Sequence, residues 1–270
     1  MSGDGFRHIL SVSGGKDSAA LAIYMRDKIS DMEYVFCDTE MELPETYEYL
    51  ARLEAVVGKP IIRLKHNGRG FDHWYAVFGG YLPCARMRWC TKYLKLHPFE
   101  QYVGDSQVIN YVGIRADEER EGYVSTKPNI KAAFPFKEDG LCYTDVVRIL
   151  SESGIGLPTY LSWRSRSGCY LCFFQQNMEW VGLLEHHPDL YWKASRYEKV
   201  DERTGKRFTW NQHESLQELA RPERIAAIKA EGQRRRQLQP VRDGLLTRIL
   251  AANDSPDSDD GPQPCLICTL

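Results

Sequence analysis

The stretch that decides the fold is Ile9–Lys28, which reads ILSVSGGKDSAALAIYMRDK. It begins inside an apolar run, Arg7–Val12, that predicts a β-strand, and it ends in Ser18–Lys28, whose apolar side chains recur at helical spacing. Between them, Gly14 and Gly15 leave backbone N–H groups open to a ligand, and the helix start adds more N–H groups and a partial positive charge. The stretch therefore predicts a strand, a phosphate-binding loop and a helix. The alternative is an ordinary strand-to-helix turn.

Strand and helix patterns continue to alternate through the first half of the chain. Short apolar runs predict strands at Met32–Asp38, 60–66 and Gln107–Ile114, and helical periodicity predicts helices at Pro44–Val57, Phe71–Phe78 and Thr91–Val103. Such alternation implies parallel strands joined by crossover helices. We therefore expect an α/β fold with a doubly wound, mainly parallel, Rossmann-like sheet.

The alternation fades after about residue 136, which predicts three parts. Residues 1–136 form the nucleotide-binding α/β domain, and residues 137–250 form a mainly helical subdomain that contributes two cysteines to a metal site. Residues 251–270 form a flexible acidic tail that ends in a Cys-x-x-Cys pair.

Composition sets broad limits on function. The 270 residues are 43% hydrophobic and 27% charged, with a formal net charge of −2, so an argument for nucleic-acid binding must be local. No apolar run reaches the roughly 18 residues of a membrane span, and the first residues do not resemble a secretory leader. We therefore expect a cytoplasmic protein without membrane association. In that compartment the eight cysteines favour metal or redox roles over disulfides.

The loop Ser13–Ser18, with the sequence SGGKDS, resembles the signature of the PP-loop pyrophosphatases, also called adenine nucleotide alpha hydrolases. This superfamily includes phosphoadenosine phosphosulfate (PAPS) reductase. The resemblance implies cleavage of ATP between its α- and β-phosphates, with pyrophosphate held in the loop and AMP passed to an acceptor. The segment VFCDTE (Val35–Glu40) places Asp38 and Thr39 at the end of the second predicted strand, where such sheets bind ligands. The segment VGIRADEERE (Val112–Glu121) resembles the Gly-x-Arg-x-x-Glu-x-Arg segment of PAPS reductase-like proteins and brings in Arg115, with Glu118 and Arg120.

The resemblance implies the following candidate site. The catalytic residues are Lys16, Asp17 and Ser18, and Mg²⁺ neutralises the bridging phosphate oxygens. The nucleotide-binding residues are Ser11, Ser13, Gly14, Gly15, Lys16, Asp17, Ser18, Asp38, Thr39, Gly113 and Arg115.

Four cysteines form a candidate metal site. Cys169 and Cys172 have the two-residue spacing that lets both thiolates reach one metal. Cys84 and Cys90 lie among Arg86, Arg88 and Lys92, whose charges favour thiolates. Four thiolates suit a [4Fe–4S] cluster, but a zinc site needs the same number.

The segments CTKYLKLHPFE and RSGCYLC, which hold three of these cysteines, resemble segments of PAPS reductase-like proteins. The full spacing, Cys-x5-Cys followed by Cys-x2-Cys, most resembles the ATP pyrophosphatases of DNA phosphorothioation systems, the DndC and SspD type. This resemblance implies a [4Fe–4S] cluster and, as partners, a cysteine desulfurase and other modification subunits. Cluster-containing sulfonucleotide reductases differ, because their first two cysteines are adjacent and they carry a Glu-Cys-Gly-x-His motif that is absent here.

These observations predict an ATP pyrophosphatase with a [4Fe–4S] cluster that acts in sulfur transfer, with DNA backbone phosphorothioation as the most specific version. Three alternatives remain: a PAPS or APS reductase, a tRNA thiolation enzyme, and a non-catalytic subunit of a defence complex that binds nucleotide and DNA.

Two C-terminal features have open interpretations. Arg221–Arg248 holds eight basic and three acidic residues, which suits DNA or another polyanion but also a solvated helix or a surface for an acidic partner. Cys265 and Cys268 can carry sulfur into the site, complete a zinc site with Cys169 and Cys172, or have no role.

Overall fold

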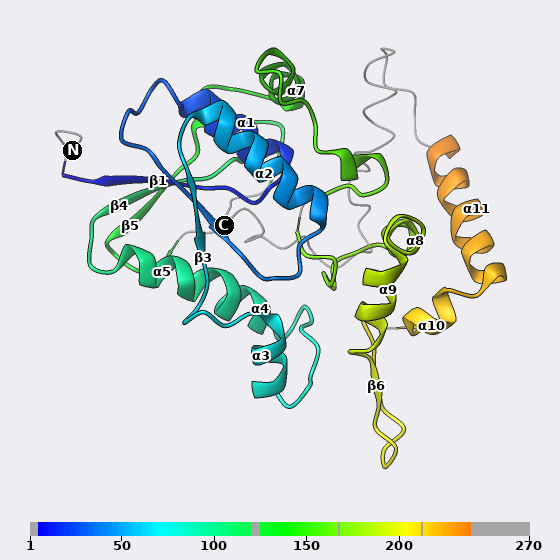
Figure 1. Cartoon of the computed structure of the whole chain (residues 1–270). Coiled ribbons are helices and arrows are strands. Elements are labelled where there is room, and N and C mark those ends of the chain that lie inside the picture. Colours follow the sequence, from blue (N-terminus) through cyan, green and yellow to red (C-terminus); the bar gives the residue numbers. More distant parts are fainter. Residues whose placement is uncertain (1–4, 120–124, 167, 212, 239–270) are drawn as a thin grey trace.

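The computed structural model describes residues 5–119, 125–166, 168–211 and 213–238 (Figure 1). Its centre is a five-stranded sheet of β1 (Arg7–Ser11), β2 (Glu33–Cys37), β3 (Ile61–Leu64), β4 (Val108–Tyr111) and β5 (Ile130–Ala133). The strand order is β3-β2-β1-β4-β5, and every neighbouring pair is parallel. The predicted doubly wound α/β fold is therefore confirmed.

Helices cover both faces of the sheet (Figure 1). On one face lie α1 (Lys16–Met25) and α2 (Pro44–Val57), which share a core with the side chains of Leu10, Tyr34 and Phe36. On the other face, α5 (His97–Val103) packs Phe99 and Val103 against the alternate side chains of the same strands. The sheet is buried on both sides, as a parallel sheet requires.

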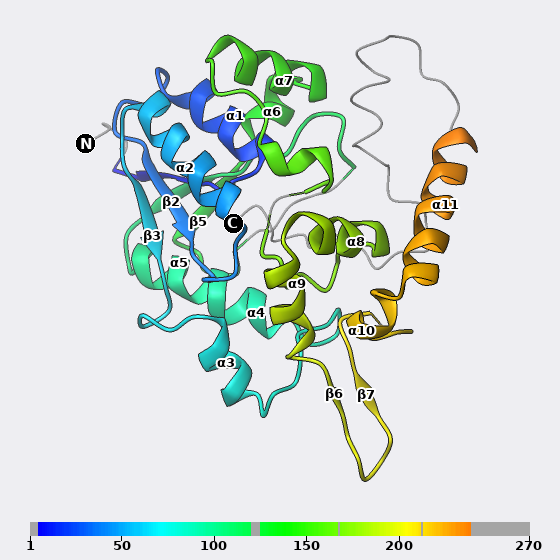
Figure 2. The same ribbon diagram turned by 45° about the vertical axis from the view of Figure 1, so that its right-hand side comes forward.

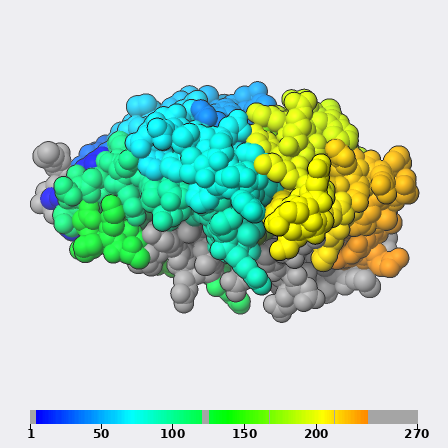
Figure 3. Space-filling view, turned by 90° about the horizontal axis from the view of Figure 1, so that it is seen from below, coloured from blue at the N-terminus to red at the C-terminus, as the bar shows by residue number. Residues whose placement is uncertain are grey.

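A second core lies beyond the sheet, where helices from distant parts of the chain meet. It includes α3 (Phe71–Val77), α8 (Asn177–His186), α9 (Pro188–Ser195), α10 (Leu216–Leu219) and α11 (Pro222–Leu238). The hairpin of β6 (Lys199–Val200) and β7 (Arg207–Phe208) projects from this part (Figure 2). It borders the α3 segment on the surface (Figure 3), where the Tyr75 hydroxyl donates to the Tyr197 carbonyl at 3.0 Å.

Three details differ from the sequence prediction. Strand β5 was not predicted, because it is a four-residue edge strand with only Ile130 buried. The predicted helix Thr91–Val103, in which Pro98 indicated a break or a new first turn, is α4 (Trp89–Thr91), a π-helical turn (Lys92–Leu96) and α5 in succession, with Pro98 in the first turn of α5. Pro98 has no N–H to donate to the preceding turn, which favours this local widening.

The third detail concerns α7 (Tyr143–Glu152), which we expected in the helical subdomain. It packs instead on α1, and its Val146 and Leu150 are fully buried in the core of the sheet domain. Two short segments flank it, α6 (Pro135–Glu138) before it and a 3₁₀ turn (Thr159–Ser162) after it.

The strand order predicts where on the sheet a ligand would bind. The chain leaves β1 toward β2 on one side and later returns to pair β4 on the other, so the order reverses between β1 and β4. Ligands of open α/β sheets bind outside the carboxyl ends of the strands at such a point. The residues that follow β1, β2 and β4 are therefore at the expected position for a site.

Candidate functional site

The loop after β1 has a backbone that only glycine fits. Gly14 has φ +72°, and a Cβ placed there would lie 2.5 Å from Cγ2 of Thr46 in α2. Gly15 is the extended residue that precedes the first turn of α1, and the hydroxyl of Tyr160 donates to the Gly14 carbonyl at 2.8 Å. The loop is thus held between α2 and the 3₁₀ turn, with the amino end of α1 directed at the site.

The two serines of the loop bond to each other. The Ser13 amide donates to Ser18 Oγ at 3.0 Å, and the two hydroxyl oxygens lie 3.2 Å apart. Ser18 Oγ also donates to the Gly15 carbonyl at 3.2 Å. These contacts fold Ser13–Ser18 into one compact turn.

The charged residues of the loop connect it to β4. Asp17 Oδ1 lies 2.9 Å from Arg115 Nη1, and Lys16 Nζ lies 3.6 Å from Asp17 Oδ2. Arg115 also contacts Asp117 and Glu118, at 3.0 and 3.3 Å. Burial alone would lower the pKa of Arg115, but the charges of Asp17 and Glu118 outweigh it and raise that pKa. The cations Lys16 and Arg115 therefore meet at the carboxyl edge of the sheet.

Gly113 allows the segment after β4 to lie close to the first turn of α1. A Cβ on Gly113 would lie 3.0 Å from the Asp17 carbonyl oxygen and 3.2 Å from the Ser18 amide nitrogen. The segment after β4 thus lies directly against the first turn of α1, which brings Arg115 to Asp17.

The residues that follow β2 are buried beside the loop. Asp38 Oδ1 accepts from the Tyr47 hydroxyl at 2.8 Å and from the Glu40 amide at 2.9 Å. The Thr39 hydroxyl donates to Glu42 Oε1 at 2.8 Å. The predicted nucleotide residues after β1, β2 and β4 therefore share one edge of the sheet.

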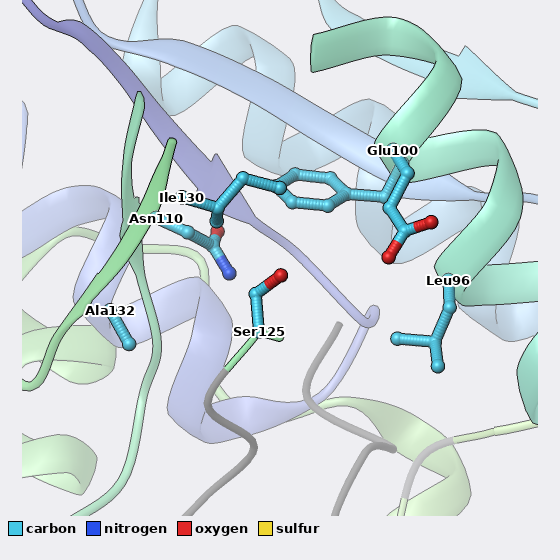
Figure 4. Close-up of a pocket in the computed structure, with 7 residues that line it drawn as sticks. Leu96, Glu100, Asn110, Ser125, Ile130 and Ala132 are labelled. Carbon is cyan, nitrogen blue, oxygen red and sulfur yellow. The ribbon is translucent and has the colours of Figure 1, made fainter. Parts of the chain in front are cut away.

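Ser11 has a different position from the other predicted nucleotide residues. Its hydroxyl donates to Asn110 Oδ1 at 3.0 Å, inside the sheet. Asn110 lines a small hollow between α5 and strands β4 and β5, together with Glu100 and Ser125 (Figure 4). Ser11 thus connects two strands below the site edge.

The four predicted metal-ligating cysteines are not equivalent. Cys169 interacts electrostatically with Cys90, which comes from α4, and with Cys172 of its own loop. Burial, and then the neighbouring Cys172, raise the pKa of the Cys169 thiol. Cys84 lies on an exposed turn closed by two backbone bonds to Met87. Within the described ranges, no three Cys, His, Asp or Glu side chains are arranged around a common metal position.

Two charged residues next to these cysteines were missed by sequence reasoning. Arg164 is 2% exposed, and its Nη2 donates to the Cys169 carbonyl at 2.9 Å. Glu42 is 7% exposed and interacts electrostatically with Arg164. The arginine preceding the Cys-x-x-Cys pair was a visible signal, but charge in a loop usually indicates solvent exposure.

The basic segment Arg221–Arg248 is described only as far as residue 238, in α11. There, Arg224 pairs with Glu214 at 2.7 Å, and Arg235 pairs with Glu231 at 2.6 Å. Arg120, Cys265 and Cys268 lie outside the described residues. In the part of the chain that the structure describes, no helix is both long and apolar enough to cross a membrane.

Comparison with known proteins agrees with this geometry. Residues 7–137 match the model of the phosphoadenosine phosphosulfate reductase domain. This part of the chain is similar to the PAPS reductase domain. The matched residues include the phosphate loop, Asp38 and Arg115. Cys169, Cys172 and the helical part that follows them lie beyond the match.

Several curated proteins are also similar to parts of the chain. The uncharacterized proteins MJ0066 and MJ0973 of Methanocaldococcus jannaschii are 27% and 26% identical, over 68% and 67% of this chain. The matches cover 40% and 45% of those proteins, so the chain spans less than half of their length. The uncharacterized nin region protein ORF290 of Escherichia phage lambda is 28% identical over 46% of this chain and 52% of its own length.

A solved structure is also similar to part of the chain. It is the crystal structure of PAPS reductase from Candida auris, a phosphate complex, with 16% identity and a TM-score of 0.49. The similarity covers 61% of this chain and 81% of that protein.

Proposed function

We propose that the chain cleaves ATP between its α- and β-phosphates and uses the AMP group to activate an acceptor for sulfur transfer. The observation that supports this most is that the loop Ser13–Ser18, Asp38 and Arg115 follow the neighbouring strands β1, β2 and β4 at the carboxyl edge of the sheet, where Arg115 pairs with Asp17. A PAPS reductase-like domain in residues 7–137 supports nucleotide-dependent sulfur chemistry in general.

In this proposal the loop binds the pyrophosphate half of ATP. The amides of Gly14 and Gly15 and the amino end of α1 donate to phosphate oxygens, and Lys16 supplies a buried positive charge. Arg115 is oriented by Asp17 and stabilises the charge that develops as pyrophosphate leaves. Asp38, held by Tyr47, binds the nucleoside. Mg²⁺, when bound, would supply charge neutralisation to the phosphates.

The cysteines supply the sulfur side of the proposal. In this proposal Cys84, Cys90, Cys169 and Cys172 hold a [4Fe–4S] cluster, on the resemblance of their spacing. In the described structure Cys169 interacts electrostatically with Cys90 and Cys172, and the four thiols do not surround a common metal position. Of the two metals considered, we propose iron over zinc on the resemblance of the cysteine spacing. The most specific acceptor is the DNA backbone, with a cysteine desulfurase as the sulfur-supplying partner.

Product analysis with ATP labelled at the α-phosphate tests the reaction. We expect AMP and pyrophosphate, with no ADP, and stimulation by duplex DNA. Lys16→Met is expected to remove at least about 99% of this activity, the scale associated with losing one transition-state charge contact. Lys28→Met is the matched control, because Lys28 lies just beyond the same helix and its Nζ, 3.3 Å from Asp139, is exposed. ADP as the product, or equal activity of both variants, would contradict the proposal.

The main alternative predicts other products. The match of residues 7–137 to the PAPS reductase domain favours testing PAPS with a dithiol reductant. Release of sulfite without ATP cleavage would replace the pyrophosphatase proposal with a reductase. Stimulation of AMP release by tRNA but not by DNA would change the acceptor and keep the reaction.

A further inference from the structure

The β6–β7 hairpin is an arm that is fixed at its base. Phe208 and Arg207 are neighbours in β7, so their side chains point to opposite faces of the hairpin. On one face Phe208 packs edge to face on Tyr81, just after α3, with the ring centres 5.1 Å apart. On the other face Arg207 forms an ion pair with Glu218 of α10. The base of the hairpin is therefore held between the α3 segment and α10.

The tip of the hairpin is closed by Asp201. Its carboxylate accepts from the amides of Arg203 and Thr204 at 3.0 and 3.2 Å, and its carbonyl accepts from the Gly205 amide at 2.7 Å. The Asp201 amide in turn donates to the Lys206 carbonyl at 2.8 Å. The projecting loop therefore has one defined shape, and it presents the side chains of Arg203 and Lys206 to solvent.

Cations dominate this part of the surface. Residues 192–208 hold six basic and three acidic residues, a local charge of +3 in a chain whose net charge is −2. Two of the three carboxylates, those of Glu198 and Asp201, accept from backbone amides, and only Glu202 remains. Among the described residues, no carboxylate forms an ion pair with the exposed cations at the tip and near the end of α9, which are Lys193, Arg196, Arg203 and Lys206.

The basic helix α11 differs in this respect. Three of its cations form ion pairs with carboxylates, namely Arg224 with Glu214, Lys229 with Glu185 and Arg235 with Glu231. A cation that must leave a carboxylate to bind phosphate gains less than one that has no such partner. The surface formed by the hairpin and the end of α9 is therefore better suited to a polyanion than α11.

Exposed apolar side chains lie in the same stretch. Trp192 of α9 is 42% exposed, and Val200 of β6 is 58% exposed. Helix α9 leads directly into β6, so these side chains alternate along the chain with the unpaired cations (Figure 2). Cations together with apolar contacts suit a ligand in which phosphates alternate with sugars, rather than a small anion.

We propose that the β6–β7 hairpin and the adjoining end of α9 bind the backbone of duplex DNA, with the hairpin directed into the major groove. The inference rests on the proposed function, which takes DNA as the acceptor, and it names the surface that binds this acceptor. A two-stranded ribbon fits the major groove of B-DNA, whereas side chains cannot read the deep, narrow major groove of duplex RNA. Lys193, Arg196, Arg203 and Lys206 contact the phosphates.

Fluorescence anisotropy of a labelled DNA duplex, roughly two helical turns long, tests this surface. Binding to the full chain is measured without ATP at several salt concentrations. The variant Arg203→Gln/Lys206→Gln removes the two tip cations. The matched control is Arg26→Gln/Arg148→Gln, which removes the same charge from two exposed arginines of the sheet domain, after α1 and in α7.

We expect Arg203→Gln/Lys206→Gln to bind DNA roughly 10- to 50-fold more weakly than wild type at about 0.1 M salt, because two phosphate contacts are lost. The slope of log affinity against log salt should become shallower by about 2. The control should stay within about twofold of wild type, since salt screens distant charges. Arg203→Lys/Lys206→Arg keeps both charges and should bind as wild type.

Four results would overturn the inference. Equal weakening by the tip variant and the control would show that binding follows net charge rather than this surface. A larger loss with Arg234→Gln/Arg235→Gln would assign DNA binding to α11. Tighter binding of tRNA than of DNA through the same two tip cations would replace DNA by RNA as the ligand. No binding by wild type at about 100 μM protein, the weak end of non-specific affinity, would also overturn it.

The proposed reaction is judged separately, because the binding measurement contains no ATP. DNA binding that depends on Arg203 and Lys206, in a protein that releases no AMP from ATP, would reject the ATP pyrophosphatase proposal and support this surface. AMP release without DNA binding would do the opposite.

Discussion

The phosphate loop and the cysteine region differ in how their polar groups are satisfied. In the loop, Ser13 bonds to Ser18, and Asp17 pairs with Arg115 at 2.9 Å. In the cysteine region, which comprises Cys90, Cys169, Cys172 and the neighbouring Glu42 and Arg164, Glu42 Oε2 and Arg164 Nε and Nη1 are buried and have no hydrogen-bond partner among the described residues. The side chains of the loop Ser13–Ser18 are thus held by contacts within the described chain. The cysteine region contains donors that its own chain does not satisfy.

This difference indicates two kinds of site. A loop organised before its ligand arrives needs little rearrangement to bind phosphate, so its affinity is expected to depend on backbone shape. A region with unsatisfied buried donors is expected to gain stability when its ligand binds, because binding supplies the missing partners. Four predictions test this comparison.

The largest expected effect is a difference in thiol reactivity. Cys84 is exposed, whereas burial raises the pKa of Cys37, at the end of β2, to about 12. At pH 8 the Cys37 thiol is therefore protonated, and we expect its alkylation to be roughly a thousandfold slower than that of an unperturbed thiol. A short iodoacetamide pulse followed by peptide mass spectrometry measures this. Similar labelling of Cys37 and Cys84 in the folded protein would show that solvent and reagent reach the carboxyl end of β2.

The next effect concerns loop shape. Gly14→Ala places a Cβ against Thr46 and forces φ +72° on alanine, so we expect AMP release to fall at least about a hundredfold, the scale of a 1 Å misplacement. Gly58→Ala is the matched control, since Gly58 has φ +68° with no atom within 4 Å of its Cβ position. It should lower the free energy of unfolding by about 1–2 kcal/mol and leave nucleotide affinity unchanged. Equal loss of activity in both variants would mean that general destabilisation of the fold, not the contact with Thr46, lowers the activity.

A smaller effect is expected at the ion pair. Asp17→Asn removes one of three carboxylates around Arg115, whose side chain is 12% exposed, and should lower the free energy of unfolding by about 1–3 kcal/mol. Asp117→Asn, whose carboxylate is 38% exposed, should cost less than about 1 kcal/mol. Chemical denaturation of the two variants measures the difference. The reverse order would indicate that Asp117 is the main partner of Arg115.

The smallest effect tests the link between the two regions. Tyr160→Phe removes the hydroxyl that donates to the Gly14 carbonyl and should lower the free energy of unfolding by about 1 kcal/mol. We also expect nucleotide affinity, measured by calorimetry, to fall a few-fold. Tyr24→Phe removes an exposed hydroxyl that donates to Asp139 at 2.6 Å, and its effect should stay within about 0.5 kcal/mol. If Tyr160→Phe is as mild as Tyr24→Phe, the segment does not support the loop.

Local sequence patterns predicted much of the sheet domain. Helix α2 has the predicted bounds, Pro44–Val57, because a proline at the first turn and a left-handed Gly58 after its end are local signals. The loop Ser13–Ser18 was also predicted from local signals, namely two glycines between a strand pattern and a helix pattern. The short edge strand β5 was missed, because four residues with one buried side chain give no periodicity.

The sequence by itself determined the strand-loop-helix unit, the parallel sheet and the turn Ser13–Ser18, since each follows from side-chain periodicity and glycine placement within a few neighbouring residues. Only the tertiary structure decided that Arg115 pairs with Asp17, that Cys84 lies on an exposed turn, and that Arg164 is buried and bonded to the Cys169 carbonyl. These facts depend on which distant segments enclose a group, and the enclosure, rather than the residue type, determines whether a charge is solvated or needs a partner.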